Sequence, residues 1–273
     1  MEIFIIIVAV ILLLVGWLLF QTAPRMLGRV KREPFLGVFY AHRGLFDNAS
    51  EAPENSLAAF RKAVEAGYGM ELDVQLSKDN RLVVFHDATL KRMCGVEGNV
   101  WDYTLEELKQ FKLLDSDERI PTLEEFLEVV DGKAPFILEY KLDRPQTLVC
   151  ELADRLLQEY PGVYCIESFH PQALIWYRKH RPEVMRGQLC EEFFRNPAHR
   201  GKIHYWLISF LPFNFMTRPD FIAYNHAHAG NPARRLCKRM GGLSVAYTVR
   251  SLEEYEKAKT KFDLIIFDSC ILK

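Results

Sequence analysis

The chain has 273 residues, 49% of them hydrophobic, so it can bury one large core and still carry a terminal segment outside it. Its 35 basic and 36 acidic residues are spread along the chain and give a formal net charge of −1, which argues against a nucleic-acid partner. The six cysteines include no CxxC pair and no zinc-finger spacing, so we expect free, mostly buried thiols in a reducing compartment.

An uncharged apolar run occupies residues 3–20 and is long enough to cross a lipid bilayer. The chain starts without the basic segment of a signal peptide, and no small-x-small cleavage site follows the run, so an uncleaved transmembrane anchor over residues 1–22 is favoured. A basic juxtamembrane linker is expected over residues 23–36. By the positive-inside rule, its charges predict a single-pass membrane protein with the large domain in the cytoplasm; they are Arg25, Arg29, Lys31 and Arg32.

Short β-rich runs alternate with amphipathic stretches beyond residue 35, the pattern of a parallel α/β protein. One run, at residues 81–86, follows the strand at 69–75 after only a few residues. Because a parallel crossover needs a dozen or more, this run must return antiparallel, within an insertion covering about residues 77–121. Eight other strands remain, which predicts a (β/α)8 barrel over residues 37–273 with its active site at the C-terminal strand ends. The strands are expected at residues 37–41, 69–75, 135–141, 163–167, 184–188, 221–224, 243–248 and 263–267, and helices at 53–66, 144–159, 171–180 and 252–259.

Acidic residues recur at a spacing of two on the predicted strands. Glu71 and Asp73 are two residues apart, so their side chains share a face and can converge on one cation. Glu139 and Lys141 repeat this spacing in an otherwise apolar strand, where an isolated buried charge would be costly. A metal beside the carboxylates and an anion beside the lysine would offset that cost.

Histidines are also expected at the mouth of the barrel. His42 and Arg43 follow the first strand, and the planar guanidinium of Arg43 suits bidentate binding of a phosphate. His86 ends the apolar run of the insertion. Two histidines directed at one metal-bound substrate would supply an acid and a base near neutral pH.

These motifs together resemble the glycerophosphodiester phosphodiesterase family, closely so over about residues 37–141. The resemblance implies a TIM barrel with a small insertion after the second strand. It also implies divalent-metal ligands at Glu71, Asp73 and Glu139, an acid/base pair at His42 and His86, and phosphate contacts at Arg43 and Lys141. The motifs are AHRG at 41–44, APENSLAAF at 52–60, ELDVQLSKDNRLVVFHDATLKRMCG at 71–95 and ILEYK at 137–141.

Past Lys141 the resemblance is looser. Tyr247 stands where the family usually has tryptophan, which makes it a candidate for the substrate pocket, and Phe267 replaces a threonine before Asp268. These departures concern the specificity for the leaving group more than the chemistry.

The activity that the resemblance implies is metal-dependent hydrolysis of a glycerophosphodiester to an alcohol and glycerol 3-phosphate, with one Mg²⁺ or Ca²⁺ ion as cofactor. Two alternatives stay open: a barrel phospholipase that forms a cyclic phosphate, and an inactive membrane-bound module that binds lipid. The expected signature of the inactive module, a lost metal ligand or histidine, is not found.

An apolar segment at residues 206–216 is too rich in large side chains for an ordinary solvated connection. The simpler interpretation, and the one favoured, is a buried barrel helix. The alternative is a segment near the site that contacts the membrane or an acyl chain, which would favour lysophospholipids over water-soluble diesters as substrates.

Overall fold

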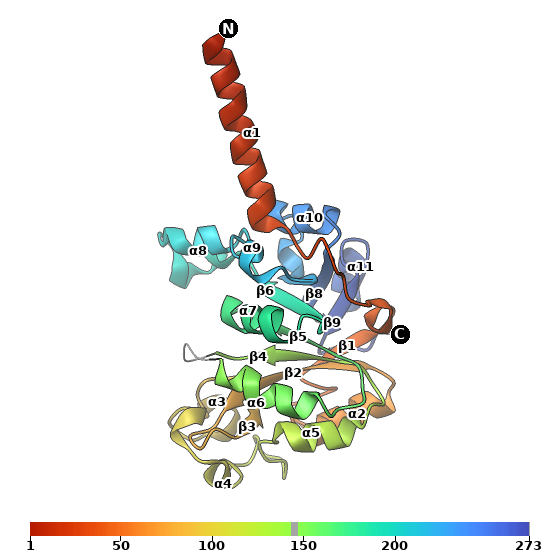
Figure 1. The fold of residues 1–273 in the computed structure, drawn as a ribbon. Helices are drawn as coiled ribbons and strands as arrows, with labels where there is room; N and C mark the ends of the chain where they lie inside the picture. The colour runs from red at the N-terminus through yellow and green to blue at the C-terminus, as the bar shows by residue number, and fades with distance from the viewer. Residues whose placement is uncertain (143–146, 273) are drawn as a thin grey trace.

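Eight parallel strands close into a barrel in the computed structural model, which describes residues 1–142 and 147–272 (Figure 1). Each barrel strand pairs with the next along the chain, and β1 pairs with both β2 and β9, which closes the barrel. The (β/α)8 barrel predicted from the sequence is therefore confirmed. Its strands are β1 (Phe39–His42), β2 (Gly69–Leu76), β4 (Phe136–Tyr140), β5 (Tyr164–Ser168), β6 (Arg186–Cys190), β7 (Phe221–Asn225), β8 (Leu243–Val249) and β9 (Leu264–Phe267).

The barrel interior is apolar toward the N-terminal ends of the strands and acidic toward their C-terminal ends. Because side chains alternate along a strand, Ile137 and Glu139 share the inner face of β4. The apolar layer packs as one buried cluster. Phe35 from the short helix η1 (Glu33–Phe35) is part of this cluster and covers it at the N-terminal end of the barrel. The hydroxyl of Tyr40, inside this layer, donates to the carbonyl of Phe35 at 3.0 Å. The buried carboxylates of the inner face, such as Glu139, thus lie toward the C-terminal end of the barrel.

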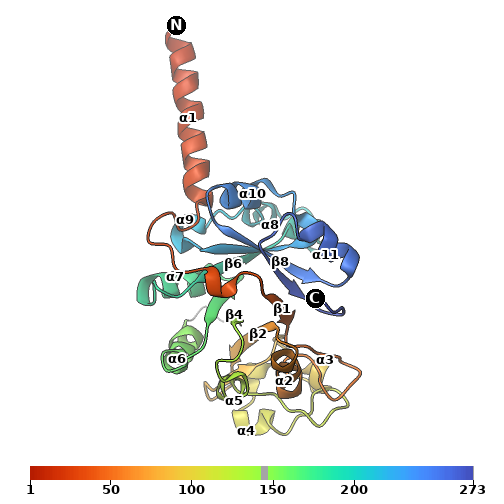
Figure 2. The ribbon, with the colours of Figure 1, turned by 90° about the vertical axis from the view of Figure 1, so that its right-hand side faces the viewer.

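Helices cover the outer face of the barrel and pack against outward-facing side chains such as Leu72 and Val74 (Figures 1 and 2). They are α2 (Leu57–Glu65), α5 (Leu123–Val130), α6 (Leu148–Leu157), α7 (Pro171–His180), α8 (Ile203–Ile208), α9 (Asn214–Thr217), α10 (Pro232–Arg239) and α11 (Leu252–Ala258). Short turns of helix connect them at η3 (Phe193–Arg195), η4 (Pro197–His199) and η5 (His226–His228).

The helix predicted at residues 53–66 begins later than expected. Its first turn starts at Leu57, after Ser56, whose hydroxyl accepts a hydrogen bond from the main-chain nitrogen of Ala59 at 3.1 Å. Asn55, just before this cap, has a φ of 57° and is excluded from the helix by that left-handed conformation. The helix predicted at residues 144–159 lies only partly within the described part of the chain. In residues 147–159, which are described, α6 begins at Leu148.

The run after β2 forms β3 (Leu82–Val84), which pairs antiparallel with β2 as predicted. Beyond it lie α3 (Lys91–Cys94), η2 (Val100–Asp102) and α4 (Leu105–Leu108). The insertion has its own buried apolar cluster, which includes Phe85, Met93 and Leu108. This packing places the residues that follow β3 at the mouth of the barrel.

Helix α1 (Glu2–Thr22) stands away from the barrel with its apolar side chains exposed (Figures 1 and 2). Its length and hydropathy are those of a membrane span or of a signal sequence. The residues after it pack on the barrel. Arg25 forms an ion pair with buried Asp220 at 3.2 Å, and Arg32 donates to the carbonyl of Gly241 at 2.8 Å.

The apolar segment at residues 206–216 is not the buried helix that was expected. It contributes to α8 and α9, and the side chains of Trp206 and Leu207 are 47% and 51% exposed. Leu211, between the two helices, is buried. The segment therefore lies on the surface and is held to the barrel at its middle.

Candidate active site

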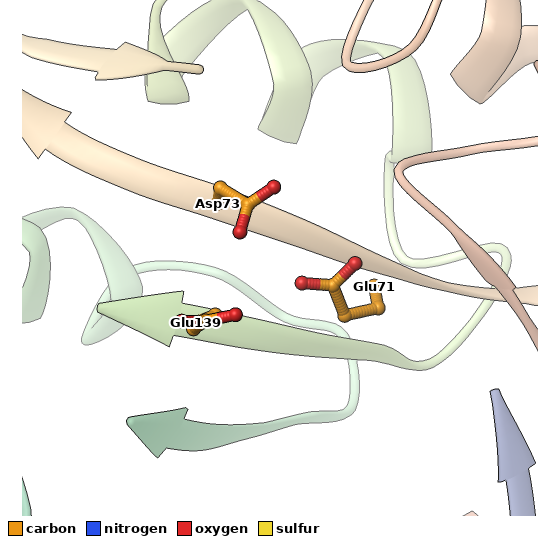
Figure 3. Close-up of side chains that lie close together, drawn as sticks. All are labelled: Glu71, Asp73 and Glu139. Carbon is orange, nitrogen blue, oxygen red and sulfur yellow. The ribbon is translucent and has the colours of Figure 1, made fainter. Parts of the chain in front are cut away.

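Three buried carboxylates meet at the C-terminal end of the barrel, as the spacing of the residues predicts. Glu71 and Asp73 extend from β2, and Glu139 extends from the neighbouring strand β4, where it lies in register with Asp73 (Figure 3). One carboxylate oxygen from each lies within 4.8 Å of those of the other two. The separation suits three oxygen ligands around one divalent cation, which binds them at about 2.0–2.6 Å.

Negative charge is in excess at this cluster, since Glu167 on β5 lies in register with Glu139 and is also buried. Burial raises the pKa of Glu71 well above its usual value, and the neighbouring carboxylates, Asp73 first, raise it further. Burial likewise raises the pKa of Glu139 and of Glu167. Hard oxygen donors in a surplus of negative charge fit a divalent metal ion, which would bind them in their ionised form.

Asp73 stays ionised in these surroundings. Burial alone would raise its pKa, but Lys141, His86 and Arg43 together lower it well below its usual value. The Lys141 ammonium lies 2.9 Å from Oδ1 of Asp73 and 2.5 Å from Oε1 of Glu139. The amide of Asn55 donates to the other Asp73 oxygen at 2.8 Å, which accounts for the left-handed turn before α2.

Arg43 is bound to the acidic residues by both its main chain and its side chain. Its main-chain nitrogen donates to Glu71 at 3.2 Å, and its guanidinium lies 2.6 Å from Glu54 and 3.4 Å from Asp73. The residue has a φ of 56°, and Gly44 follows with a φ of 83°, where an added Cβ would lie 2.9 Å from the backbone of Ala59. The loop thus turns sharply to bring Arg43 over the carboxylates.

His42 lies beside Glu71, with 3.9 Å between its Nε2 and the carboxylate Oε2. Its Nδ1 is 3.0 Å from Oδ2 of Asp268, which follows β9 on the other side of the barrel closure. Burial lowers the pKa of His42, although the hydrogen bond to Asp268 opposes this. With Nδ1–H donating to Asp268, Nε2 is left as an acceptor toward the metal-ligand cluster.

His86 reaches the mouth from the insertion and is the more exposed of the two histidines. The main-chain nitrogen of Phe85 donates to the carbonyl of Asp73 at 3.0 Å. This hydrogen bond holds His86, the following residue, beside the acidic cluster. His86 Nδ1 lies 2.7 Å from Asp87, and Arg92 joins Asp87 to Glu54 by hydrogen bonds of 2.7–2.9 Å. The insertion is thereby tied to the loop after β1.

Tyr247 lies in the wall of the mouth rather than in the charged cluster. Its hydroxyl donates to the carbonyl of Cys190 at 3.0 Å, and its ring meets that of Phe169 edge to face, with centroids 6.2 Å apart. Phe169 of this pair lines an apolar cavity of about 130 Å³, together with residues that include Cys190, Phe193 and Ile208. The candidate substrate pocket is apolar on this side.

The site contains several residues that the sequence-based prediction did not select. Glu167 lies within a strand, and Asp268 directly follows one. A search for charged residues in or next to apolar strands, the reasoning applied to Glu139, would have found both. Glu54 and Asn55 directly precede Ser56, the N-cap of α2. Their contacts with Arg43 and Asp73 depend on the tertiary structure.

Comparison with known proteins gives consistent results. The family model described as "Glycerophosphoryl diester phosphodiesterase family" matches residues 42–271. A glycerophosphodiester phosphodiesterase of Caldanaerobacter subterraneus is 32% identical over 241 residues, covering 84% of this chain and 92% of that protein. Lysophospholipase D GDPD1 of Rattus norvegicus is 34% identical over 150 residues, 50% of this chain and 46% of its own length. The crystal structure of a glycerophosphodiester phosphodiesterase from Thermotoga maritima matches with a TM-score of 0.64 and 27% identity, covering 85% of this chain and 94% of that one.

Proposed function

The chain belongs to the glycerophosphoryl diester phosphodiesterase family and is a phosphodiesterase of that class, and on this premise we propose how its residues divide the reaction. The protein hydrolyses a glycerophosphodiester to an alcohol and glycerol 3-phosphate at the cluster of Glu71, Asp73 and Glu139. The observation that carries the proposal is the convergence of these three buried carboxylates beside two histidines, each held by an aspartate through Nδ1.

Glu71, Asp73 and Glu139 are the proposed ligands of one divalent cation, Mg²⁺ or Ca²⁺. When bound, the cation would hold a phosphate oxygen of the substrate and offset the charge that develops on the phosphoryl group. The surplus of buried negative charge supports this assignment, because ionised Glu71 is costly without a cation.

The two histidines are the proposed proton-transfer pair. His42 is partly buried and its pKa is lowered, so it is neutral near pH 7 and suited to accept a proton at Nε2. His86, oriented by Asp87, is then left to protonate the departing alcohol. Arg43 and Lys141, which now pair with carboxylates, are close enough to share their charge with a bound phosphate.

Product analysis distinguishes this reaction from its alternatives. Glycerophosphocholine would be incubated with the purified full-length chain and Mg²⁺ or Ca²⁺, and the products followed by phosphorus NMR. Glycerol 3-phosphate as the end product supports the proposal. An accumulating cyclic phosphate would instead identify a phospholipase that stops at the cyclic product, and no turnover with either metal would favour an inactive lipid-binding module.

A lysophospholipid is the second candidate substrate, and its hydrolysis would release lysophosphatidic acid. Support comes from the similarity to lysophospholipase D GDPD1 and from the apolar cavity beside Tyr247 and Phe169. The comparison that tests it is the kcat/KM for lysophosphatidylcholine against that for glycerophosphocholine. A strong preference for the soluble diester would count against this substrate.

Residues 3–20 are proposed to anchor the protein in the membrane, with the barrel in the cytoplasm. The basic residues after α1 support this orientation. Arg25 and Arg32 also bind the barrel directly, so the anchor is joined to it through a packed segment and not a loose tether. The orientation can be tested with protease added to sealed right-side-out vesicles, whose cytoplasmic face lies inside. The barrel should be protected from cleavage.

A further inference from the structure

One face of α8 is apolar and exposed although it lies on the surface of the catalytic barrel. Ile203, Trp206 and Leu207 follow the i, i+3, i+4 spacing that places side chains on the same helix face. Their exposed fractions are 73%, 47% and 51%. Three large neighbouring side chains left in water are unfavourable and mark an interaction surface.

The position of this face relative to α1 indicates what covers it. The ring of Phe215 in α9 packs against Trp17 and Phe20, at centroid distances of 6.3 and 5.6 Å, where α1 ends. Asn214, also in α9, donates to the carbonyl of Thr22 at 3.0 Å. Only residues 209–213 separate α9 from α8, and both helices lie on the side of the barrel nearest α1, opposite the insertion (Figures 1 and 2).

The charges around α8 suit an anionic lipid surface. No aspartate or glutamate occurs from residue 193 to residue 219, whereas Arg200, Lys202 and Arg218 do, and Arg195 in this stretch is paired with Glu192 just before it. The apolar face continues toward α1 through Phe213 and Met216, which are 42% and 40% exposed. Basic residues beside tryptophan and large aliphatic side chains are typical of segments that lie in the interfacial layer of a bilayer.

The same segment adjoins the mouth of the barrel. Ile208 of α8 and Phe213 line the apolar cavity of about 130 Å³, whose opposite wall is formed by Phe169, Leu189 and Cys190 at the ends of β5 and β6. The barrel strands run across the direction of α1, and β4 ends on the side where α8 lies (Figure 1). The mouth therefore opens beside the plane in which α1 would leave the bilayer.

We propose that the α8 face, formed by Ile203, Trp206 and Leu207, inserts into the interfacial layer of the bilayer that α1 spans. This second contact fixes the barrel with one rim of its mouth beside the membrane surface, so that a lysophospholipid can enter the site head group first while its acyl chain stays in apolar surroundings. The proposal rests on the proposed anchor and substrate, and its primary test is independent of catalysis.

Tryptophan fluorescence in vesicles tests the contact directly. The full-length chain has four tryptophans, so Trp17→Phe first removes the one inside α1. This variant and Trp17→Phe/Trp206→Phe are reconstituted in phosphatidylcholine/phosphatidylglycerol vesicles with brominated acyl chains, which quench only near the membrane. We expect clear quenching that disappears with Trp206. Equal quenching in both variants, or emission from Trp206 that aqueous iodide quenches freely, would overturn the proposal.

Kinetics supply the second arm. Trp206→Glu is expected to raise the KM for lysophosphatidylcholine in anionic vesicles about tenfold, while the rate on glycerophosphocholine stays unchanged and reports correct folding. Val163→Glu, at another exposed apolar position away from α8, is the matched control and should leave both unchanged. An unchanged vesicle KM in Trp206→Glu would contradict the membrane contact. Loss of glycerophosphocholine turnover in the unmodified protein would instead contradict the proposed function, and the quenching result would still stand by itself.

Discussion

His42 and Asp268 join the first and last strands of the barrel across its closure, with 3.0 Å between Nδ1 and Oδ2. The two residues are 226 positions apart in sequence, and Asp268 has no other role in the proposed chemistry than to orient this imidazole. A carboxylate in that position selects the tautomer and the ring orientation of the histidine.

Asp268→Asn should therefore reduce kcat by about 10–100-fold, the usual cost of removing a partner that orients a functional histidine. KM should change little, since Asp268 is not one of the proposed phosphate contacts. Asp115→Asn, at an exposed position in the insertion, is the matched control. An Asp268→Asn enzyme with unchanged kcat would show that His42 needs no such support.

Metal binding should stabilise the fold, because it relieves repulsion among buried carboxylates. At a concentration of 100 times Kd, a cation that binds only the folded state adds about 2.7 kcal/mol, which raises the Tm by roughly 5–10 °C for a chain of this size. Differential scanning fluorimetry with Mg²⁺, Ca²⁺ or chelator measures the shift. It should be absent in Glu139→Gln, and an equal shift in that variant would place the cation elsewhere.

Glu167 predicts a pH dependence of stability in the metal-free protein. Its pKa is raised by burial, so the folded state holds the proton more tightly than the unfolded state. Glu167 therefore has little effect on the free energy of unfolding near pH 4. It destabilises the fold increasingly as the pH rises above about 4.3, the pKa of glutamate in an unfolded chain. Glu167→Gln should then increase the free energy of unfolding at pH 8 by about 1–3 kcal/mol, but little at pH 4. Urea unfolding at both pH values checks this, and equal changes at the two would contradict it.

Arg92 should matter for catalysis although it lies outside the acidic cluster. It holds Asp87, the partner of His86, against Glu54 of the first loop. Arg92→Gln should reduce kcat several-fold, by at most about tenfold, by loosening His86, with a smaller effect on stability because the arginine is half exposed. Lys91→Gln removes a neighbouring exposed ion pair and should leave kcat unchanged. Similar kcat values in both variants would remove His86 orientation as the reason.

Much of the barrel could be predicted because loop length and strand pattern are local properties. The short link before residues 81–86 excluded a parallel crossover, and β3 is antiparallel. The shared face of Glu71 and Asp73 follows from strand geometry in the same way. The start of α2 could not be predicted, because the turn at Asn55, in the loop before α2, depends on a hydrogen bond to Asp73 on β2.

The exposed face of α8 shows a different limit. Apolar composition alone does not tell a buried helix from one that contacts a membrane, since both exclude water. The exposure of Trp206 and Leu207 excludes the buried helix, and the placement of α8 beside α9 and the end of α1 is the reason for proposing a membrane contact. Likewise, the position of Lys141 predicted a phosphate contact, and only the fold shows its ammonium between Asp73 and Glu139.

The most direct test of the central claim is the turnover of glycerophosphocholine by Glu71→Gln in the presence of saturating Mg²⁺ or Ca²⁺. This variant keeps the shape of the side chain and removes one proposed metal ligand. We expect kcat to fall by at least about 100-fold, since metal-assisted charge stabilisation commonly contributes several kcal/mol. Glu253→Gln on the exposed surface of α11 is the control and should keep the full rate. A folded Glu71→Gln protein with the wild-type rate would contradict the assignment of this site.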